Sequence, residues 1–163
     1  MYAAESAFSA VLSAPSFCLG IRCSDTAITA IDFLPPCAPR PPQTSLAEEA
    51  VRQLAAYLAD ARFRFTLPLA PAGTAFQRRV WAAIAQIPPG ATRSYGALAR
   101  ALGSGARAVG NACGANPYPL VIPCHRVVAS QGLGGFAGRR GGFLLDVKRW
   151  LLAHERSRQG ADR

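Results

Sequence analysis

The sequence has few histidines, no long apolar run and no leader pattern at its N-terminus. No uninterrupted apolar segment approaches the roughly 20 residues that a membrane-spanning helix needs. A basic segment followed by a long apolar one, which would indicate a secretory signal, is missing as well. We therefore expect a cytoplasmic protein without membrane association, and its apolar content of 50% suffices for a packed core.

The cysteines are few, odd in number and not spaced as pairs. Of the five, Cys18, Cys23 and Cys37 lie in the first half, Cys113 and Cys124 in the second, and none forms a C-x-x-C motif. A disulfide framework is not expected in a cytosolic chain of this size. The first half has no histidine with which its three cysteines could complete a zinc site, so no metal site is predicted.

Acidic residues are scarce in the second half of the chain. Residues 76–163 contain 13 Lys or Arg and three acidic residues, whereas residues 1–75 contain five arginines and six acidic residues. A basic half beside a near-neutral half indicates that one face binds a polyanion, and a cytosolic location favours nucleic acid. Basic surfaces are common, so this charge does not by itself select the partner.

The length fits one ordinary domain or two small ones, and we predict two, residues 1–73 and 74–163. The first is expected to be a small α+β unit. Its predicted elements are strands at 17–21, 26–33 and 63–67 and a helix at 46–60, opened by a capping box of Ser45 and Glu48. The apolar face of that helix is expected to carry Val51, Leu54, Ala55 and Leu58.

The second domain is expected to be mainly helical. Its predicted helices span residues 75–87, 95–102, 106–115 and 143–155. Thr74 and Gln77 form a capping box for the first, and Ser94 caps the second. The two short helices around Gly103-Ser104-Gly105 outline a helix-turn-helix. The predicted fold class is α+β, with a small N-terminal sheet-plus-helix unit packed on a mainly helical C-terminal domain that contains this motif.

The tetrapeptide Pro123-Cys124-His125-Arg126 carries the strongest chemical signal in the chain. A thiolate is the nucleophilic form of cysteine, and a neighbouring base or cation lowers the pKa of the thiol. Cys124 beside His125 therefore has the context of an activated nucleophile. Taken alone, the pair could equally be a buried structural cysteine next to an unrelated histidine.

The segments on either side of this tetrapeptide favour the first interpretation. In chain order they are Thr74-Ala-Phe-Gln-Arg-Arg-Val-Trp81, Ile87-Pro-Pro-Gly90, Ser94-Tyr-Gly-Ala-Leu-Ala99, Arg107-Ala-Val-Gly110, Asn116-Pro-Tyr-Pro119 and Lys148-Arg-Trp-Leu-Leu-Ala-His-Glu155. Together with Pro-Cys-His-Arg, this order strongly resembles the O6-alkylguanine-DNA alkyltransferases, also called methylated-DNA–protein-cysteine methyltransferases. The resemblance covers roughly residues 74 to 155.

The resemblance implies DNA repair by direct reversal. An alkyl group on guanine O6 in DNA, with O4-alkylthymine as a second possible substrate, would be transferred to the sulfur of Cys124. Because the product thioether is a very poor leaving group, each molecule would act once. The implied partner is alkylated double-stranded DNA, bound by a monomer through the minor groove with the target base flipped out. No organic cofactor or catalytic metal is implied, and the residues of the structural zinc site that some relatives carry are not evident here.

The resemblance also assigns catalytic roles. His125 would take the thiol proton through a water, Glu155 would orient His125, and both would lower the pKa of Cys124. On an extended strand the side chains of Cys124 and His125 would point to opposite faces. Asn116 would fix the turn before the cysteine and bond the acid, and Tyr95 would contact the guanine. Without the resemblance, Glu155 would be a solvated acid in the last turn of its helix, Asn116 would be a helix C-cap, and Tyr95 would be a core aromatic.

For DNA binding the resemblance points to the second short helix. Arg107 would fill the gap left by the flipped base, although a phosphate contact is the simpler interpretation. The small residues Ala108 and Gly110 fit close approach to a minor groove, or equally close packing in a core. The remaining expected contacts are Arg126 and Tyr95 with DNA, and Pro119, Val127, Phe136 and Ala137 around the substrate pocket. Phe136 stands where the family often has tyrosine, and Arg139-Arg140-Gly141-Gly142 lengthens that loop.

Two other functions explain part of the sequence. The chain could recognise alkylated bases without repairing them, although family members of that kind lack the cysteine. It could also be a helix-turn-helix regulator with a redox-sensing thiol, which leaves Glu155, Asn116 and Tyr95 without roles.

Overall fold

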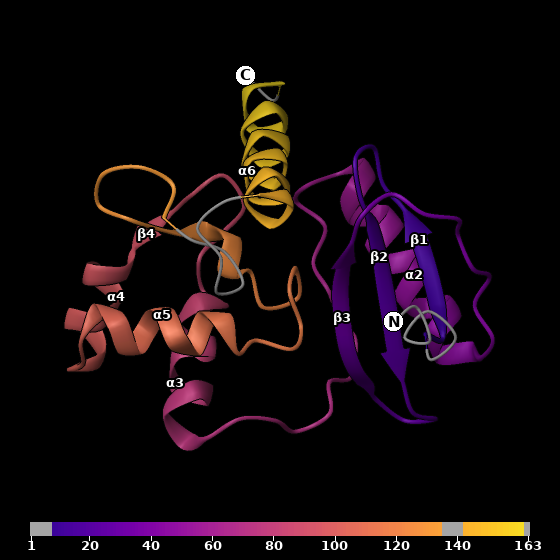
Figure 1. The fold of residues 1–163 in the computed structure, drawn as a ribbon, viewed down its shortest axis with the longest axis horizontal. Helices are drawn as coiled ribbons and strands as arrows, with labels where there is room; N and C mark the ends of the chain where they lie inside the picture. Colours follow the sequence, from indigo (N-terminus) through magenta and orange to yellow (C-terminus); the bar gives the residue numbers. More distant parts are fainter. Residues whose placement is uncertain (1–7, 135–141, 162–163) are drawn as a thin grey trace. The chain divides into compact units, whose positions relative to one another are not determined.

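The computed structural model describes residues 8–134 and 142–161 and divides the chain into two compact units, Met1–Pro71 and Ala72–Arg163 (Figure 1). The expected pocket residues Phe136 and Ala137, and the loop arginines Arg139 and Arg140, lie outside the described residues. Within the described ranges, the chain contains no helix with the length and apolarity required to cross a membrane.

The first unit contains an antiparallel sheet in the order β1 (Ala10–Ser13), β2 (Cys18–Cys23) and β3 (Ile28–Leu34). The two strands predicted around residues 17–33 are confirmed with slightly shifted ends. The strand predicted at 63–67 is wrong, and β1 is instead the third strand of the sheet.

Helix α2 (Ser45–Ala59) packs against β1 and β2 and lies behind the sheet in Figure 1. Its N-cap is Thr44, whose side chain accepts the Ala47 N–H, so the predicted cap at Ser45 is one residue late. The buried face also differs from the predicted one. It consists of Ala47, Ala50, Gln53, Leu54 and Tyr57.

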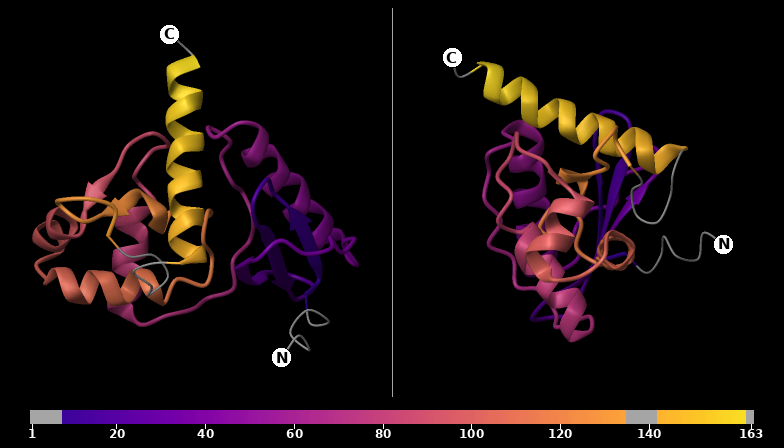
Figure 2. Two further views of the ribbon diagram at one scale, coloured as in Figure 1. Left: turned by 45° about the horizontal axis from the view of Figure 1, so that its top comes forward. Right: turned by 90° about the vertical axis from the view of Figure 1, so that its left-hand side faces the viewer.

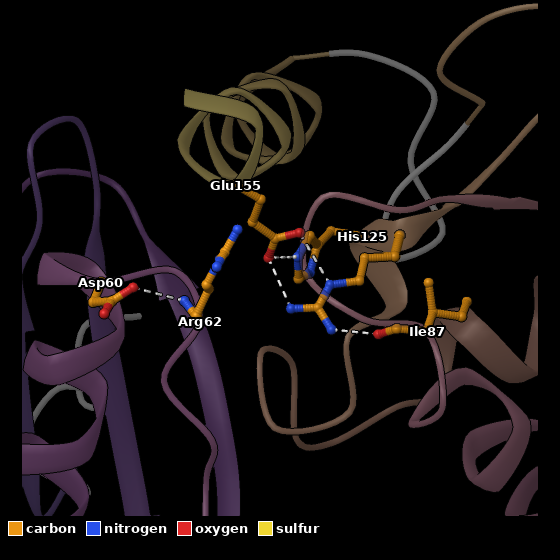
Figure 3. Close-up of polar contacts among 6 residues, drawn as sticks. Asp60, Arg62, Ile87, His125 and Glu155 are labelled. Atoms are coloured by element: carbon orange, nitrogen blue, oxygen red, sulfur yellow. Dashed lines mark hydrogen bonds and ion pairs between the residues drawn. The ribbon is translucent and has the colours of Figure 1, made fainter. Parts of the chain in front are cut away.

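Gln53 explains why residues 63–67 form no strand. Its side-chain Oε1 accepts the backbone N–H of Thr66 at 2.8 Å, and its side-chain Nε2 donates to the Thr66 hydroxyl at 2.9 Å. A ladder needs that backbone N–H, so the segment is fixed to α2 by a side chain instead. The chain leaves α2 at Asp60, whose carboxylate accepts the Arg62 N–H at 3.0 Å (Figure 3).

The second unit is mainly helical. In chain order it contains α3 (Ala75–Ile84), β4 (Arg93–Ser94), α4 (Tyr95–Leu102), α5 (Ala106–Gly114), the 3₁₀ turn η1 (Cys124–Arg126), β5 (Val127–Val128) and α6 (Phe143–Ala161). The capping box of Thr74 and Gln77 is confirmed, and so is the cap at Ser94. The α+β class predicted from the sequence is confirmed.

Helices α3, α4 and α5 pack on one another and lie together in both views of Figure 2. Gly103 ends α4 in the left-handed region at φ 65°, which glycine adopts without strain, and this allows the sharp turn into α5. Trp81 of α3 donates its indole N–H to the Ala112 carbonyl at 2.8 Å and so fixes α5 on α3. The unit therefore contains the predicted helix-turn-helix.

Two features place η1 between the helix-turn-helix and α6. The short parallel pair of β4 and β5 aligns Arg93 with Val127, which brings the residues after η1 beside the start of α4. Helix α6 packs against η1. Since α6 continues to Ala161, Glu155 lies well inside the helix, and its predicted place in the last turn is wrong.

Candidate active site

Cys124 begins the 3₁₀ turn and is buried, with 4% of its surface exposed. The preceding loop doubles back through a hydrogen bond from the Ile122 N–H to the Tyr118 carbonyl at 2.9 Å. Within that bend Leu120 takes a φ of 75°, an uncommon conformation for a residue with a branched side chain. The Arg126 N–H then closes the turn on the Pro123 carbonyl at 3.0 Å. The predicted extended strand through Cys124 and His125 is therefore wrong.

Asn116 connects this loop to the sulfur. Its amide nitrogen donates to the Ile122 carbonyl at 2.9 Å and to the Cys124 Sγ at 3.2 Å, and its amide oxygen accepts the Tyr118 N–H at 2.9 Å. The expected role in the turn is consistent with these bonds. Both amide hydrogens are directed at the loop and the sulfur, whereas the resemblance implied that Asn116 would bond the acid.

His125, Arg126 and Glu155 form a buried network (Figure 3). Glu155 extends from α6, and its Oε2 lies 2.7 Å from the His125 Nε2. The Arg126 guanidinium donates to both Glu155 oxygens, at 3.0 and 2.9 Å, and also to the Ile87 carbonyl at 2.6 Å. Arg126 was expected to contact DNA, but its side chain is buried and bonded inside the unit, so that expectation is wrong.

The charges in this network fix the form of His125. Burial would raise the pKa of Glu155, but the hydrogen bonds from His125 and Arg126 and the charge of Arg126 outweigh it and hold that pKa below its usual range. Burial lowers the pKa of His125, and with the charges of Arg126 and Lys148 it outweighs the opposing effect of Glu155. A neutral His125 that donates Nε2–H to the carboxylate has its lone pair on Nδ1, which is buried without a hydrogen-bond partner among the described residues. His125 can therefore accept a proton.

The Cys124 thiol does not have the depressed pKa that the sequence suggested. A hydrogen bond with the Cys113 thiol and burial both raise the pKa of Cys124, while the Asn116 amide and the Lys148 charge lower it by less. In the free protein this thiol is therefore protonated at neutral pH. Any reaction at its sulfur requires a group that takes the proton as the reaction proceeds.

A lysine and a tyrosine complete the surroundings of the sulfur. Lys148 of α6 is fully buried, donates to the Val127 carbonyl at 2.7 Å and lies 5.8 Å from the centre of the Tyr95 ring. Burial lowers the pKa of Lys148 to about 8. Burial, with the charges of Cys113 and Cys124, raises the pKa of Tyr95 to about 12, so its hydroxyl stays protonated and can donate.

The other expected contacts divide between the surface and the core. Arg107 is exposed in the first turn of α5, and Ala108 and Gly110 are partly exposed there. Pro119 is partly exposed beside the Cys124 loop. Val127, which was expected to line the substrate pocket, has a fully buried side chain directly after η1, and its place in the pocket stays a prediction.

The sequence analysis missed Lys148 and Cys113 at this site. The sequence pattern could have revealed Lys148. It follows Leu144 and Leu145 and precedes Leu151 at helical spacing, so it lies on the apolar stripe of α6. Glu155 continues the same stripe. A charge on such a stripe indicates a buried polar contact.

This arrangement defines a class of protein. A buried cysteine lies beside a histidine–carboxylate pair, in a unit that also contains a helix-turn-helix. The class is that of nucleic-acid-binding proteins whose chemistry is carried by one thiol.

The comparisons with known proteins identify the family. The model of the 6-O-methylguanine DNA methyltransferase DNA-binding domain matches residues 75–157. A methylated-DNA–protein-cysteine methyltransferase of Methanosarcina acetivorans is 46% identical over 112 residues, 67% of this chain and 69% of that protein. A protein of the same name from Mycolicibacterium paratuberculosis is 49% identical over 110 residues, 66% of this chain and 64% of its own. The chain belongs to the 6-O-methylguanine DNA methyltransferase family.

Solved structures extend the similarity beyond the matched domain. The O6-methylguanine methyltransferase of Mycobacterium tuberculosis superposes with a TM-score of 0.74 at 35% identity, covering 91% of this chain and 92% of that one. The Mycobacterium tuberculosis OGT in complex with DNA gives a TM-score of 0.75 at 38% identity, with the same coverage. The likeness therefore includes both units of the chain.

Proposed function

We propose that this protein repairs O6-alkylguanine in DNA by transferring the alkyl group to the sulfur of Cys124, with O4-alkylthymine as a second substrate. The observation that carries the proposal is the placement of the Cys124 Sγ, 3.2 Å from the Asn116 amide and next in the chain to a neutral, carboxylate-bound His125. Relatives of this family are named as methylated-DNA–protein-cysteine methyltransferases, and one is solved in complex with DNA.

In the proposed reaction, the Cys124 sulfur attacks the alkyl carbon as its proton leaves. An S–C bond forms, the C–O6 bond breaks, and its electron pair moves onto the guanine oxygen. His125 takes the thiol proton through a water, while Glu155 keeps the imidazole in the tautomer that accepts at Nδ1. Tyr95 stays protonated up to a pKa of about 12 and can donate to the departing guanine.

DNA binding is assigned to the helix-turn-helix. The exposed residues of α5 other than Arg107 and Asn111 have small side chains, and such a face suits close approach to the minor groove with weak sequence preference. The target base would leave the stack to reach the buried sulfur. We propose that the protein acts as a monomer in the cytoplasm.

Mass spectrometry tests the proposed function. After incubation with methylated DNA, the protein should gain one methyl group per molecule, located on Cys124, and should then stop, because a thioether does not release its alkyl group. Repeated turnover by a fixed amount of protein would reject this mechanism. Binding without any adduct would instead support a sensor of alkylated bases, and a strongly preferred DNA sequence would support a thiol-bearing regulator.

Replacing Arg107 separates base extrusion from simple charge. If Arg107 fills the space of the flipped base, Arg107→Ala should slow repair of O6-methylguanine in a duplex more than it weakens binding. The defect should shrink on single strands and vanish with the free base, because unstacking costs a few kcal/mol only in a duplex. Repair rates with the three substrates and affinities at several salt concentrations measure this.

The matched control is Arg100→Ala, which removes an exposed arginine from α4. A phosphate contact would weaken binding to damaged and normal duplexes alike and would flatten the salt dependence. The same pattern for Arg107→Ala, with an equal loss on all three substrates, would contradict the extrusion role.

A further inference from the structure

Cys18 and Cys37 are two thiols of the first unit that the proposed repair reaction does not use. Cys18 lies in β2 with 1% of its surface exposed, whereas Cys37 follows β3 and is partly exposed between the exposed residues Pro36 and Ala38. The Cys18 Sγ accepts the backbone N–H of Cys37 at 3.3 Å, and its S–H donates to the Cys37 carbonyl at 3.3 Å. The buried sulfur therefore lies against the residue that carries the second thiol.

These two hydrogen bonds bring the residues close enough for a disulfide. A cysteine sulfur lies less than about 3 Å from its own Cα, so the two Cα atoms are kept close to the range of roughly 4.4–6.8 Å that a disulfide spans. The Cys37 side chain also packs against the apolar cluster of Phe8, Val11 and Cys18. Both thiols therefore belong to the same group of packed side chains.

Backbone pairing on either side of the contact holds the two residues in place. Ser13 of β1 pairs with Cys18 of β2 in the sheet. Val11, also in β1, exchanges two backbone hydrogen bonds with Arg40 at 3.0 Å each, which ties the segment after β3 to the same strand. Since β1 is bonded to both sides, the approach of Cys18 to Cys37 is a property of the sheet and its neighbouring segment.

A simpler role explains only one of the two cysteines. Cys18 alone could satisfy the backbone N–H and carbonyl of Cys37, and this would need no particular side chain at position 37. The simpler role therefore leaves the partly exposed Cys37 thiol without a function. The two roles differ in what should happen when Cys37 is oxidised.

We propose that Cys18 and Cys37 are a redox modification site, in which a peroxide oxidises Cys37 and Cys18 then resolves the product as a reversible disulfide. Oxidation of a thiol depends on its accessibility, so the partly exposed Cys37 reacts first. Disulfides in reducing compartments are usually transient and redox-sensing, which fits one reversible bridge. This inference goes beyond the proposed function and does not depend on it.

The reaction balances in atoms and electrons. The Cys37 sulfur gives up its proton to water and attacks one peroxide oxygen, so an S–O bond forms, the O–O bond breaks, and the other oxygen leaves and is protonated to water. The Cys18 sulfur then attacks the Cys37 sulfur. The S–S bond forms, the S–O bond breaks, and the hydroxide that leaves takes the Cys18 proton. Two thiols are oxidised by two electrons, and one peroxide is reduced to two waters.

The bridge would have two consequences for the first unit. It would stop the oxidation of Cys37 at a reversible stage, because a sulfenic acid that is not resolved continues to the irreversible sulfinic acid. It would also close the chain from Cys18 to Cys37 into a loop that contains the whole of β3. Cross-linking a loop of this length in a small unit raises the Tm by about 6–12 °C.

Non-reducing peptide mapping tests the proposal. The full chain is treated with hydrogen peroxide, the remaining thiols are alkylated, and tryptic peptides are identified by mass spectrometry before and after dithiothreitol. We expect a peptide that joins Cys18 to Cys37, lighter by two hydrogen atoms than the separate peptides and split by dithiothreitol. Cys37 found as sulfinic acid beside an alkylated Cys18 would overturn the proposal, and so would a Cys37 that stays a thiol.

Two matched variants make the mapping specific. Cys37→Ala should lose the cross-linked peptide and the rise in Tm on oxidation, because its backbone still bonds the Cys18 sulfur but it has no thiol. Cys23→Ala should keep both, since Cys23 lies five residues along β2 from Cys18, roughly 16 Å away. An equal rise in Tm in Cys37→Ala, or a bridge that disappears in Cys23→Ala, would contradict the proposed pair.

Failure of this inference and failure of the proposed function give different results. Methyl transfer to Cys124 is measured with reduced wild type and with reduced Cys37→Ala, and both should form the adduct equally, because Cys37 lies in the first unit. An adduct on Cys124 without the bridge rejects the modification site and leaves the repair function standing. A bridge without an adduct rejects the repair function and leaves the modification site.

Discussion

Cys124→Ala should abolish alkyl transfer completely while DNA affinity stays close to that of the wild type. Alanine has no nucleophilic atom, and the replaced side chain is buried in η1, away from the exposed face of α5. Asn116 loses the sulfur as an acceptor but keeps the Ile122 carbonyl, so we expect a stability loss of only about 1 kcal/mol. Radiolabelled methyl transfer and fluorescence anisotropy with a damaged duplex measure the two properties.

Cys124→Ser is the companion variant. Its hydroxyl keeps the size and a hydrogen-bonding atom, yet a neutral alcohol is a much weaker nucleophile than a thiolate. It should bind damaged DNA as the wild type does and transfer nothing. Stoichiometric label on either variant, for example on Cys113, would show that Cys124 is not the acceptor.

Glu155→Gln should have the largest effect on stability. Glu155 has 2% of its surface exposed and accepts two bonds from Arg126 and one from His125. The amide keeps the shape but removes the negative charge, which leaves the buried Arg126 uncompensated. Breaking a buried pair on one side costs about 3–5 kcal/mol. Urea unfolding at neutral pH measures the loss.

The matched control on the same helix is Asp146→Asn. Asp146 pairs with Arg149 at 2.9 Å, but both side chains are mostly exposed. Exposed pairs contribute about 0–1 kcal/mol, so this variant should unfold almost as the wild type does. Equal losses from the two substitutions would contradict the role of the buried network.

The stability difference at Glu155 should depend on pH in a defined direction. The pKa of Glu155 is held below its ordinary value of 4.5, so the folded protein favours the carboxylate. A group with a lowered pKa stabilises the fold fully above its unfolded value and loses that contribution as the pH falls toward the folded value. The gap between wild type and Glu155→Gln should be complete at pH 7 and shrink below about pH 4.5.

The activity of Glu155→Gln should fall by the same factor with a soluble alkylated base and with DNA. The carboxylate orients His125 and Arg126 around the nucleophile and lies away from the exposed face of α5. A defect confined to DNA binding would give Glu155 a different role.

Local signals in the sequence predicted most of the elements. The capping box at Thr74, the cap at Ser94 and the glycine turn at Gly103 act within a few residues, and each appears in the structure where it was predicted. The strand at 63–67 was predicted from the same kind of signal and is wrong. Whether an extended segment joins a sheet depends on a partner, and here Gln53 binds its backbone instead.

In the candidate site, too, features set by neighbouring residues were predicted, and features set by distant residues were not. Cys124 and His125 were evident because they are adjacent in the sequence. The buried hydrogen bonds of Arg126 could not be predicted, because their acceptors, Ile87 and Glu155, come from distant parts of the chain. The pKa of Cys124 was predicted in the wrong direction because the sequence showed its neighbour His125 but neither its burial nor the contact with Cys113.

The sequence by itself determined the family and predicted Cys124 as the reactive thiol, because both depend on residue types and short spacings. Only the tertiary structure decided which charges are buried and which arginine is bonded inside the unit. Those properties arise when α5, η1 and α6 meet, and electrostatic effects in a buried site depend on distance and desolvation. The distances between these groups and their loss of solvent are fixed only when the chain folds.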